Sequence, residues 1–220
     1  MADKTIKNPL RKRILRDIRK EKGKYISIFL FLTFMIAIVS GMLVTSLSMM
    51  HTYDDGIETY KLEDGHFSTN SEISVADLQK IADQADSGTA KATIYKQYFY
   101  NFDYTFEGNS NYSIRLYENR EALNTYSVFE GHAPEKNGEI AIDRLFAENN
   151  NLKIGDTLTF DGKDLTICGT VAVPDYSCLF ENNSDSMFSA TTFTMGFVTA
   201  DYFKEFSESK LTYSFAYRFS

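Results

Sequence analysis

The feature that most constrains this chain is a long run without charged side chains, residues 25–50. It reads YISIFLFLTFMIAIVSGMLVTSLSMM, and a helix of that length extends about 39 Å, against a membrane hydrocarbon core of about 30 Å. A helix buried in a soluble core seldom exceeds about 20 residues and rarely follows a strongly basic segment. The run therefore predicts a transmembrane helix over residues 25–50, with residues 26–47 inside the membrane.

The same run has to be distinguished from a cleaved signal peptide. A signal peptide has an apolar stretch of about 7–15 residues, followed by a small-x-small cleavage site. Here the apolar stretch continues to Leu47, and Ser46, Ser48 and Met49 form a poor cleavage pattern. We therefore expect the helix to be retained as a membrane anchor.

The charges on either side of the run predict its orientation. Residues 1–24 contain ten Lys or Arg and three Asp or Glu, a net charge of +7, whereas residues 51–220 have a net charge of −14. Cytoplasmic flanks of membrane helices are rich in Lys and Arg. We therefore expect a protein of the cell membrane, with residues 1–24 in the cytoplasm and residues 51–220 outside it. The basic residues nearest the helix are Arg11, Lys12, Arg13, Arg16, Arg19, Lys20, Lys22 and Lys24.

Two interpretations of the basic segment remain open. Leu10, Ile14 and Ile18 recur every four residues, which fits one face of a helix lying on anionic lipid. Alternatively, the charges serve only as a topology signal and the segment is loosely ordered. The first interpretation makes the lipid bilayer the partner of these cations. Because the segment is tied to the membrane surface, we expect no nucleic acid.

Small residues recur at every fourth position of the predicted helix: Thr33, Ala37, Gly41 and Thr45. Association of helices in lipid depends on close packing, which small side chains permit. This small-residue stripe predicts a helix-packing face and a helical neighbour. Because small residues are common in transmembrane helices, chance spacing is the alternative.

Residues 51–220 predict a mixed α+β domain. Apolar residues at helical spacing behind Ser74, a residue type that caps helices, predict a helix over residues 74–85. Asp161-Gly162 between two apolar runs predicts a hairpin, and segments rich in Tyr, Phe and Ile predict mainly antiparallel strands. We expect strands at 93–101, 102–106, 112–117, 139–143, 156–160, 163–173 and 213–219, a polar turn at 107–110, and short helices at 144–148 and 201–207. Because no turn or polar tail follows the last strand, we expect the domain to be truncated at its C-terminal end.

No constellation of side chains in the sequence predicts catalysis, a cofactor or a metal. The chain has two cysteines, too few for the usual four-ligand zinc finger, and its three histidines are scattered. The phosphate-binding pattern Gly-x-x-x-x-Gly-Lys-Ser/Thr is absent, so ATP hydrolysis would require a separate subunit. Cys168 and Cys178 can form a disulfide outside the cytoplasm, or Cys168 can be a buried free thiol; both remain open.

An apolar stretch rich in Phe and Met, residues 176–197, is interrupted by polar residues 181–186. It fits a loop that contacts a ligand or partner, or a segment that folds onto the core of its own domain. We favour the core, because large exposed apolar patches are uncommon.

Three motifs of the domain are similar to those of a known family: EGHAP at residues 130–134, GEIAI at 138–142 and LKIGD at 152–156. Behind a basic segment and a first membrane helix, this order resembles the first half of the FtsX/MacB-like permease subunits of bacterial ABC transporters. The resemblance covers nearly all of residues 10–220. It implies an extracytoplasmic core domain, further membrane helices downstream, and a separate cytoplasmic ABC ATPase that works with a permease that is not itself an enzyme. It also implies that the stripe packs on other permease helices or on a second permease copy.

The residues alone support a second interpretation. A single-pass protein whose outer domain is a binding or sensing module would have the same membrane helix and the same α+β domain. An extracellular enzyme comes third, because no nucleophile or metal cluster accompanies the glycine-rich motifs.

Overall fold

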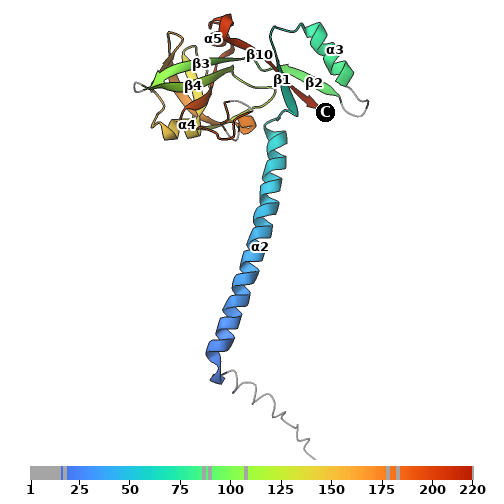
Figure 1. Ribbon diagram of the computed structural model, residues 1–220, viewed down its shortest axis with the longest axis vertical. Helices are drawn as coiled ribbons and strands as arrows, with labels where there is room; N and C mark the ends of the chain where they lie inside the picture. The colour runs from blue at the N-terminus through green and yellow to red at the C-terminus, as the bar shows by residue number, and fades with distance from the viewer. Residues whose placement is uncertain are drawn as a thin grey trace, which may run out of the picture. The chain divides into compact units, whose positions relative to one another are not determined.

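The computed structural model describes residues 16, 19–85, 88, 91–106, 109–176, 179–181 and 184–219. The chain forms two compact units, residues 1–54 and residues 55–220 (Figure 1). The described part of the chain is a mixed α+β protein with one long apolar helix and a large, mostly antiparallel sheet, as the sequence predicts.

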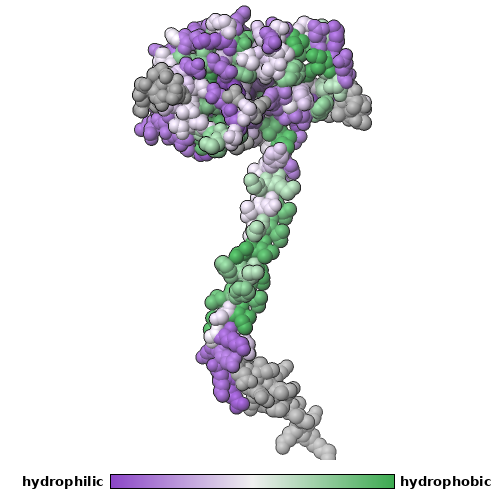
Figure 2. Space-filling model, viewed as in Figure 1, coloured by the Kyte–Doolittle hydropathy of each residue, from purple (hydrophilic) through white to green (hydrophobic). Residues whose placement is uncertain are grey.

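Helix α2 spans Lys22–Thr59, so it begins before the uncharged run and ends after it. Its apolar side chains cover the whole circumference: the consecutive residues Phe29, Leu30, Phe31 and Leu32 are each more than half exposed. Figure 2 shows the resulting apolar surface along the middle of α2, with hydrophilic residues at its N-terminal end. Among the described residues, α2 alone is long and apolar enough to cross a membrane.

The second unit is built on a sheet of ten strands within the described residues. The strands follow the order β1-β10-β3-β4-β9-β6-β8-β5, while β2 pairs with β10 and β7 with β8. Most pairs are antiparallel, but β4 with β9 and β6 with β8 are parallel. The strands are β1 (Gly65–Thr69), β2 (Ala92–Lys96), β3 (Phe99–Phe106), β4 (Asn109–Glu118), β5 (Ser127–Gly131), β6 (Glu139–Asp143), β7 (Thr157–Phe160), β8 (Lys163–Ala172), β9 (Phe193–Val198) and β10 (Leu211–Phe219). The helices are α3 (Val75–Ala85), α4 (Arg144–Asn149), α5 (Ala200–Phe203) and the 3₁₀ helices η1 (Pro174–Tyr176) and η2 (Glu208–Lys210).

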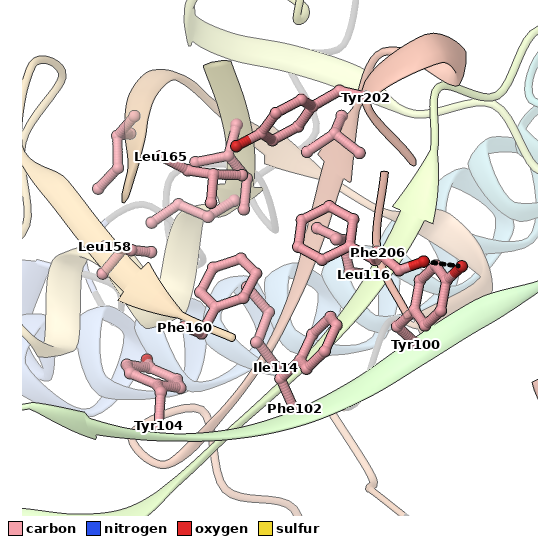
Figure 3. Close-up of a cluster of buried hydrophobic side chains, with 14 of the residues drawn as sticks. Tyr100, Phe102, Tyr104, Ile114, Leu116, Leu158, Phe160, Leu165, Tyr202 and Phe206 are labelled. Carbon is pink, nitrogen blue, oxygen red and sulfur yellow. Dashed lines mark hydrogen bonds between the residues drawn. The ribbon is translucent and has the colours of Figure 1, made fainter. Parts of the chain in front are cut away.

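Hydrophobic clusters cover both faces of the sheet. Neighbouring side chains of a strand point to opposite faces, and Ile140 belongs to one cluster whereas Ala141 belongs to the other. The first cluster is rich in aromatic rings, and Figure 3 shows Tyr100 and Phe102 of β3 beside Phe206. The Phe102 and Phe206 ring centroids are 5.3 Å apart, and the Tyr100 hydroxyl donates to the Phe206 carbonyl at 3.3 Å. The second cluster lies against β8, β9 and the segment after β8.

The strongest local signals are confirmed. The Ser74 hydroxyl accepts a hydrogen bond from the Asp77 amide at 3.2 Å and donates to the Asp77 carboxylate at 2.8 Å, which caps α3. The Asp143 carboxylate, at the end of β6, caps the first turn of α4. Asp161 and Gly162 have φ values of 52° and 71°, as a tight hairpin turn requires, and they join β7 to β8.

Several predicted boundaries are wrong. The break expected after residue 101 lies at residues 97–98, between β2 and β3. Asn109, expected in a turn, begins β4 because the ladder between β3 and β4 continues to the pair Phe106–Asn109. Helix α5 ends at Phe203 instead of residue 207, and η2 follows it. Residues 107 and 108 of the expected turn lie outside the described residues.

The segment 176–197 is only partly core, and it contains a strand that the sequence analysis does not predict. Phe193 and Met195 of β9 and Leu179 are buried in the core, as the sequence predicts for this segment. Met187 and Phe188, in contrast, are 82% and 54% exposed.

Candidate functional site

The residues that the sequence marks for helix packing lie on an exposed part of α2. Thr33, Ala37, Gly41 and Thr45 are all exposed, and a side chain added at Gly41 would meet no atom within 4 Å. Within the described residues, the stripe therefore contacts no other helix, and its partner stays a prediction.

The basic residues next to the helix are exposed wherever the structure describes them. These are Arg16, Arg19, Lys20, Lys22 and Lys24, whereas Arg11, Lys12 and Arg13 lie outside the described residues. Lys24 lies 3.6 Å from the Glu21 carboxylate, and both side chains are more than half exposed. Such exposed pairs contribute little to stability.

The last turn of α2 ends in a well-defined capping motif inside the second unit. Lys61 has a φ of 50°, and its amide donates to the Glu58 carbonyl at 3.3 Å. The Leu62 amide donates to the Ile57 carbonyl at 2.9 Å. This pair of bonds is a Schellman motif, which terminates the helix and redirects the chain toward β1. We call residues 58–64 the connector.

The connector is attached on one side to the segment between β4 and β5. The Thr125 amide donates to the Tyr60 carbonyl at 2.9 Å, and the Asn124 amide donates to the Lys61 carbonyl at 3.1 Å. The Asn124 side chain accepts from the Glu63 amide at 2.9 Å and donates to the Glu63 carboxylate at 2.5 Å. Asn124 is 1% exposed and has a φ of 50°, a conformation that Asn tolerates better than most residues.

The connector is attached on its other side to β10. The Asp64 amide donates to the Tyr217 carbonyl at 2.9 Å, and the Asp64 carboxylate accepts from the Phe219 amide at 2.7 Å. The Arg218 guanidinium donates to the Glu58 carboxylate at 2.8 Å. Strand β10 belongs to the sheet, so the connector is bonded to the sheet on one side and to the segment between β4 and β5 on the other.

A buried ion pair continues this chain of contacts into the domain. Arg120 donates to the Asp175 carboxylate at 2.7 Å, and their side chains are only 4% and 9% exposed. The guanidinium also lies 4.0 Å from the centroid of the Tyr117 ring and donates to the Asn124 carbonyl at 3.4 Å. Arg120 thereby links the segment that holds the connector to η1.

Each member of the ion pair has one polar atom without a hydrogen-bond partner, and burial and the partner's charge shift its pKa in opposite directions. Within the described residues, Arg120 Nε and Asp175 Oδ1 are buried without a hydrogen-bond partner. Burial raises the pKa of the Asp175 carboxyl, which favours the neutral acid, although Arg120 opposes this. Burial lowers the pKa of Arg120, but the charge and hydrogen bond of Asp175 together with the neighbouring Tyr117 and Tyr176 outweigh this, so its pKa is raised. Because the guanidinium stays charged and donates to the carboxylate at 2.7 Å, the geometry favours the ionised pair at neutral pH.

A cavity of about 360 Å³ lies beside the ion pair. Its lining combines cations, carboxylates and aromatic rings. Arg115, on β4, donates to the Asn101 side chain, the Tyr176 hydroxyl and the Glu181 carbonyl at 2.7–3.0 Å. The cavity is therefore polar and held in shape by hydrogen bonds between its own walls. The lining includes Glu63, His66, Arg115, Arg120, Tyr176 and Phe180.

A second group of polar side chains lies at the end of the sheet that β6, β8 and β5 form. One ligand atom from each of His132, Glu139 and Cys168 lies within 4.8 Å of the other two. Cys168 is a buried free thiol, one of the two alternatives that the sequence left open, and Cys178 lies outside the described residues. Burial raises the pKa of the Cys168 thiol to about 11.

Sequence reasoning names neither the connector contacts nor this second group. Arg120 and Asp175 are 55 positions apart. Arg120 lies in a polar segment and Asp175 follows a predicted strand, so no local pattern relates the two residues. His132 and Glu139 are part of the motifs that carry the family resemblance, but nothing in the sequence indicates that Cys168 lies beside them. In comparisons with models of known protein families and with curated proteins, the chain has no match.

Proposed function

We propose that this chain is the N-terminal part of an FtsX/MacB-like permease subunit of an ABC transporter. In this proposal α2 crosses the cell membrane, the basic segment lies in the cytoplasm, and residues 51–220 lie on the outer side. ATP hydrolysis is supplied by a separate cytoplasmic ATPase, and this chain contributes no enzymatic step. The resemblance of the 130–156 motifs and the apolar α2 support it.

The observation that carries the proposal is the connector. A helix transmits movement to a domain only if the chain between them does not act as a hinge. Here the helix ends in a Schellman motif, and the next residues are bonded to the β4–β5 segment and to β10. In this proposal these bonds pass a displacement of the connector on to the sheet, whereas a simple tether would need only a flexible linker.

The small-residue stripe supplies the second requirement of a permease. Movement that starts at an ATPase reaches α2 only through helices that pack against it. Gly41 permits such close backbone approach, because a neighbouring helix would meet no side chain there. The neighbours in this proposal are other permease helices or a second copy of the chain.

The test is an in-membrane cross-linking experiment on the chain in its native membrane. Gly41→Leu separates the helix backbones, so cross-linking to neighbouring helices should decrease strongly. Leu43→Ala is the matched control, because residue 43 lies on the opposite side of α2 and its truncation should leave cross-linking unchanged. Equal cross-linking of wild type and both variants would contradict the permease proposal.

The cavity beside Arg120 favours one alternative, a single-pass anchored module that binds a small polar ligand. Its volume of about 360 Å³ falls within the range of small-molecule sites. Such a module needs no helical partner, so the cross-linking experiment separates the two functions.

A further inference from the structure

The group at His132, Glu139 and Cys168 combines three kinds of metal ligand. His132 follows β5, Glu139 begins β6, and Cys168 lies in β8, which pairs with both of these strands. Ligand atoms around a tetrahedral zinc ion, with bonds of about 2.0–2.3 Å, are roughly 3.3–3.8 Å apart. The observed limit of 4.8 Å exceeds this by about 1 Å. Rotation of the exposed His132 ring and of the half-buried Glu139 side chain can close that difference.

A strand irregularity places Cys168 in this group. Along the parallel ladder between β6 and β8, Ile140 pairs with Ile167 and the next residue, Ala141, pairs with Gly169. Cys168 is therefore the extra residue of a bulge. Bulges re-aim side chains and are over-represented next to functional sites.

Two glycines bring the backbones that carry His132 and Cys168 close together. A side chain at Gly131 would overlap the Cys168 carbonyl, and one at Gly169 would overlap the His132 carbonyl. The His132 amide donates to the Cys168 carbonyl at 3.1 Å. The separation of these two ligand-bearing residues is thus fixed by main-chain geometry.

Neighbouring backbone groups orient the side chains of Glu139 and His132. One oxygen of Glu139, Oε2, accepts from the amides of Glu135 and Lys136 at 2.9 and 3.1 Å, which leaves Oε1 available. Nδ1 of His132 lies 2.8 Å from the Ala133 carbonyl. A carbonyl oxygen can only accept, so Nδ1 carries the hydrogen and the lone pair is on Nε2. Backbone partners of this kind orient metal-binding histidines.

We infer that His132, Glu139 and Cys168 form a binding site for Zn²⁺, with a fourth position open to solvent. A thiolate with an imidazole suits Zn²⁺, whereas Ca²⁺ and Mg²⁺ require sets of oxygen ligands. The bound ion would join the 132–138 loop to β8. Without a metal, the same residues have structural roles: the Cys168 thiol donates to the His132 carbonyl at 3.4 Å, and Glu139 holds the loop.

The test uses the full chain without a histidine tag, purified in detergent. One equivalent of Zn²⁺ should bind, and Co²⁺ should give the near-ultraviolet charge-transfer band of a thiolate ligand. His132→Ala should weaken Zn²⁺ binding more than about 100-fold, since loss of an outer-shell partner alone costs 10–100-fold. Cys168→Ser should abolish the cobalt band. Because His132 is exposed, its variant should fold normally, which near-ultraviolet circular dichroism verifies.

Two control variants decide the origin of any binding. His51→Ala removes another exposed imidazole of the chain, and Cys178→Ser removes the second thiol; both should bind Zn²⁺ as the wild type does. The inference is overturned if Zn²⁺ does not bind, if His132→Ala binds as tightly as the wild type, or if the cobalt band follows Cys178 instead of Cys168.

Discussion

The variant Arg120→Ala tests the buried link between the connector segment and η1. It removes the guanidinium that lies 2.7 Å from the Asp175 carboxylate and 4.0 Å from the Tyr117 ring. The carboxylate stays behind in a site where it is 9% exposed and where one of its oxygens already lacks a partner. Breaking a buried ion pair in this way costs about 3–5 kcal/mol, because an uncompensated charge remains.

A double-variant cycle separates the ion pair from the packing of its side chains. Arg120→Met and Asp175→Leu should each be strongly destabilising, whereas the double variant should come closer to the wild type. The physical reason is that two apolar side chains of similar volume leave no buried charge. Additive effects of the two changes would refute the coupling that the geometry implies.

Urea unfolding of the full chain in detergent measures these free energies. The chain has 14 Tyr and no Trp, so near-ultraviolet circular dichroism of tyrosine is the suitable signal. Lys204→Ala is the matched control, since its ion pair with Asp201 is exposed on both sides, and it should not change the midpoint. A loss below about 1 kcal/mol for Arg120→Ala would refute the reasoning.

Three further predictions follow from the same structure. The destabilisation by Arg120→Ala should shrink as the pH falls toward about 4, the ordinary pKa of Asp. Burial raises the Asp175 pKa, so Asp175 of the folded variant becomes protonated and the unpaired charge disappears. Urea unfolding at each pH measures this change. Gly131→Ala should lower the unfolding midpoint more than Gly138→Ala. Both residues have positive φ, which costs an alanine about 1–2 kcal/mol, but only at Gly131 would the added side chain overlap a backbone carbonyl. Residues 51–220 should fold without the apolar residues 25–50 and melt cooperatively as a monomer, whereas a broad transition with strong dye binding would count against this.

The sequence predicts those parts of the fold that depend on local interactions. The hairpin at Asp161-Gly162 follows from turn geometry, and the capped helices α3 and α4 follow from side chains that bond neighbouring amides. Strand β9 could not be recognised, because all six residues are buried between β4 and β6 and show no alternation. Its parallel pairing with β4 depends on chain reversals that no local pattern records.

The candidate sites depend on contacts between distant residues. Asn124 lies in a polar segment that resembles a surface loop, yet it is 1% exposed and holds the connector. Cys168 reads as one more residue of an apolar strand, and only the bulge against β6 places it beside His132. The length of the uncharged run therefore predicts the apolar helix, but not how the end of that helix is attached.

The most direct test of the account is the topology of α2. An amine-reactive reagent that cannot cross membranes is applied to spheroplasts that express the full chain, and labelled lysines are identified by mass spectrometry before and after permeabilisation. Lys80 and Lys204 have side chains that are each 71% exposed, so the account predicts that both are labelled at once. Lys22 and Lys24, at the start of α2, should be labelled only after permeabilisation. Labelling of Lys22 and Lys24 in intact spheroplasts, or protection of Lys80 and Lys204, would contradict a membrane helix with its basic end in the cytoplasm.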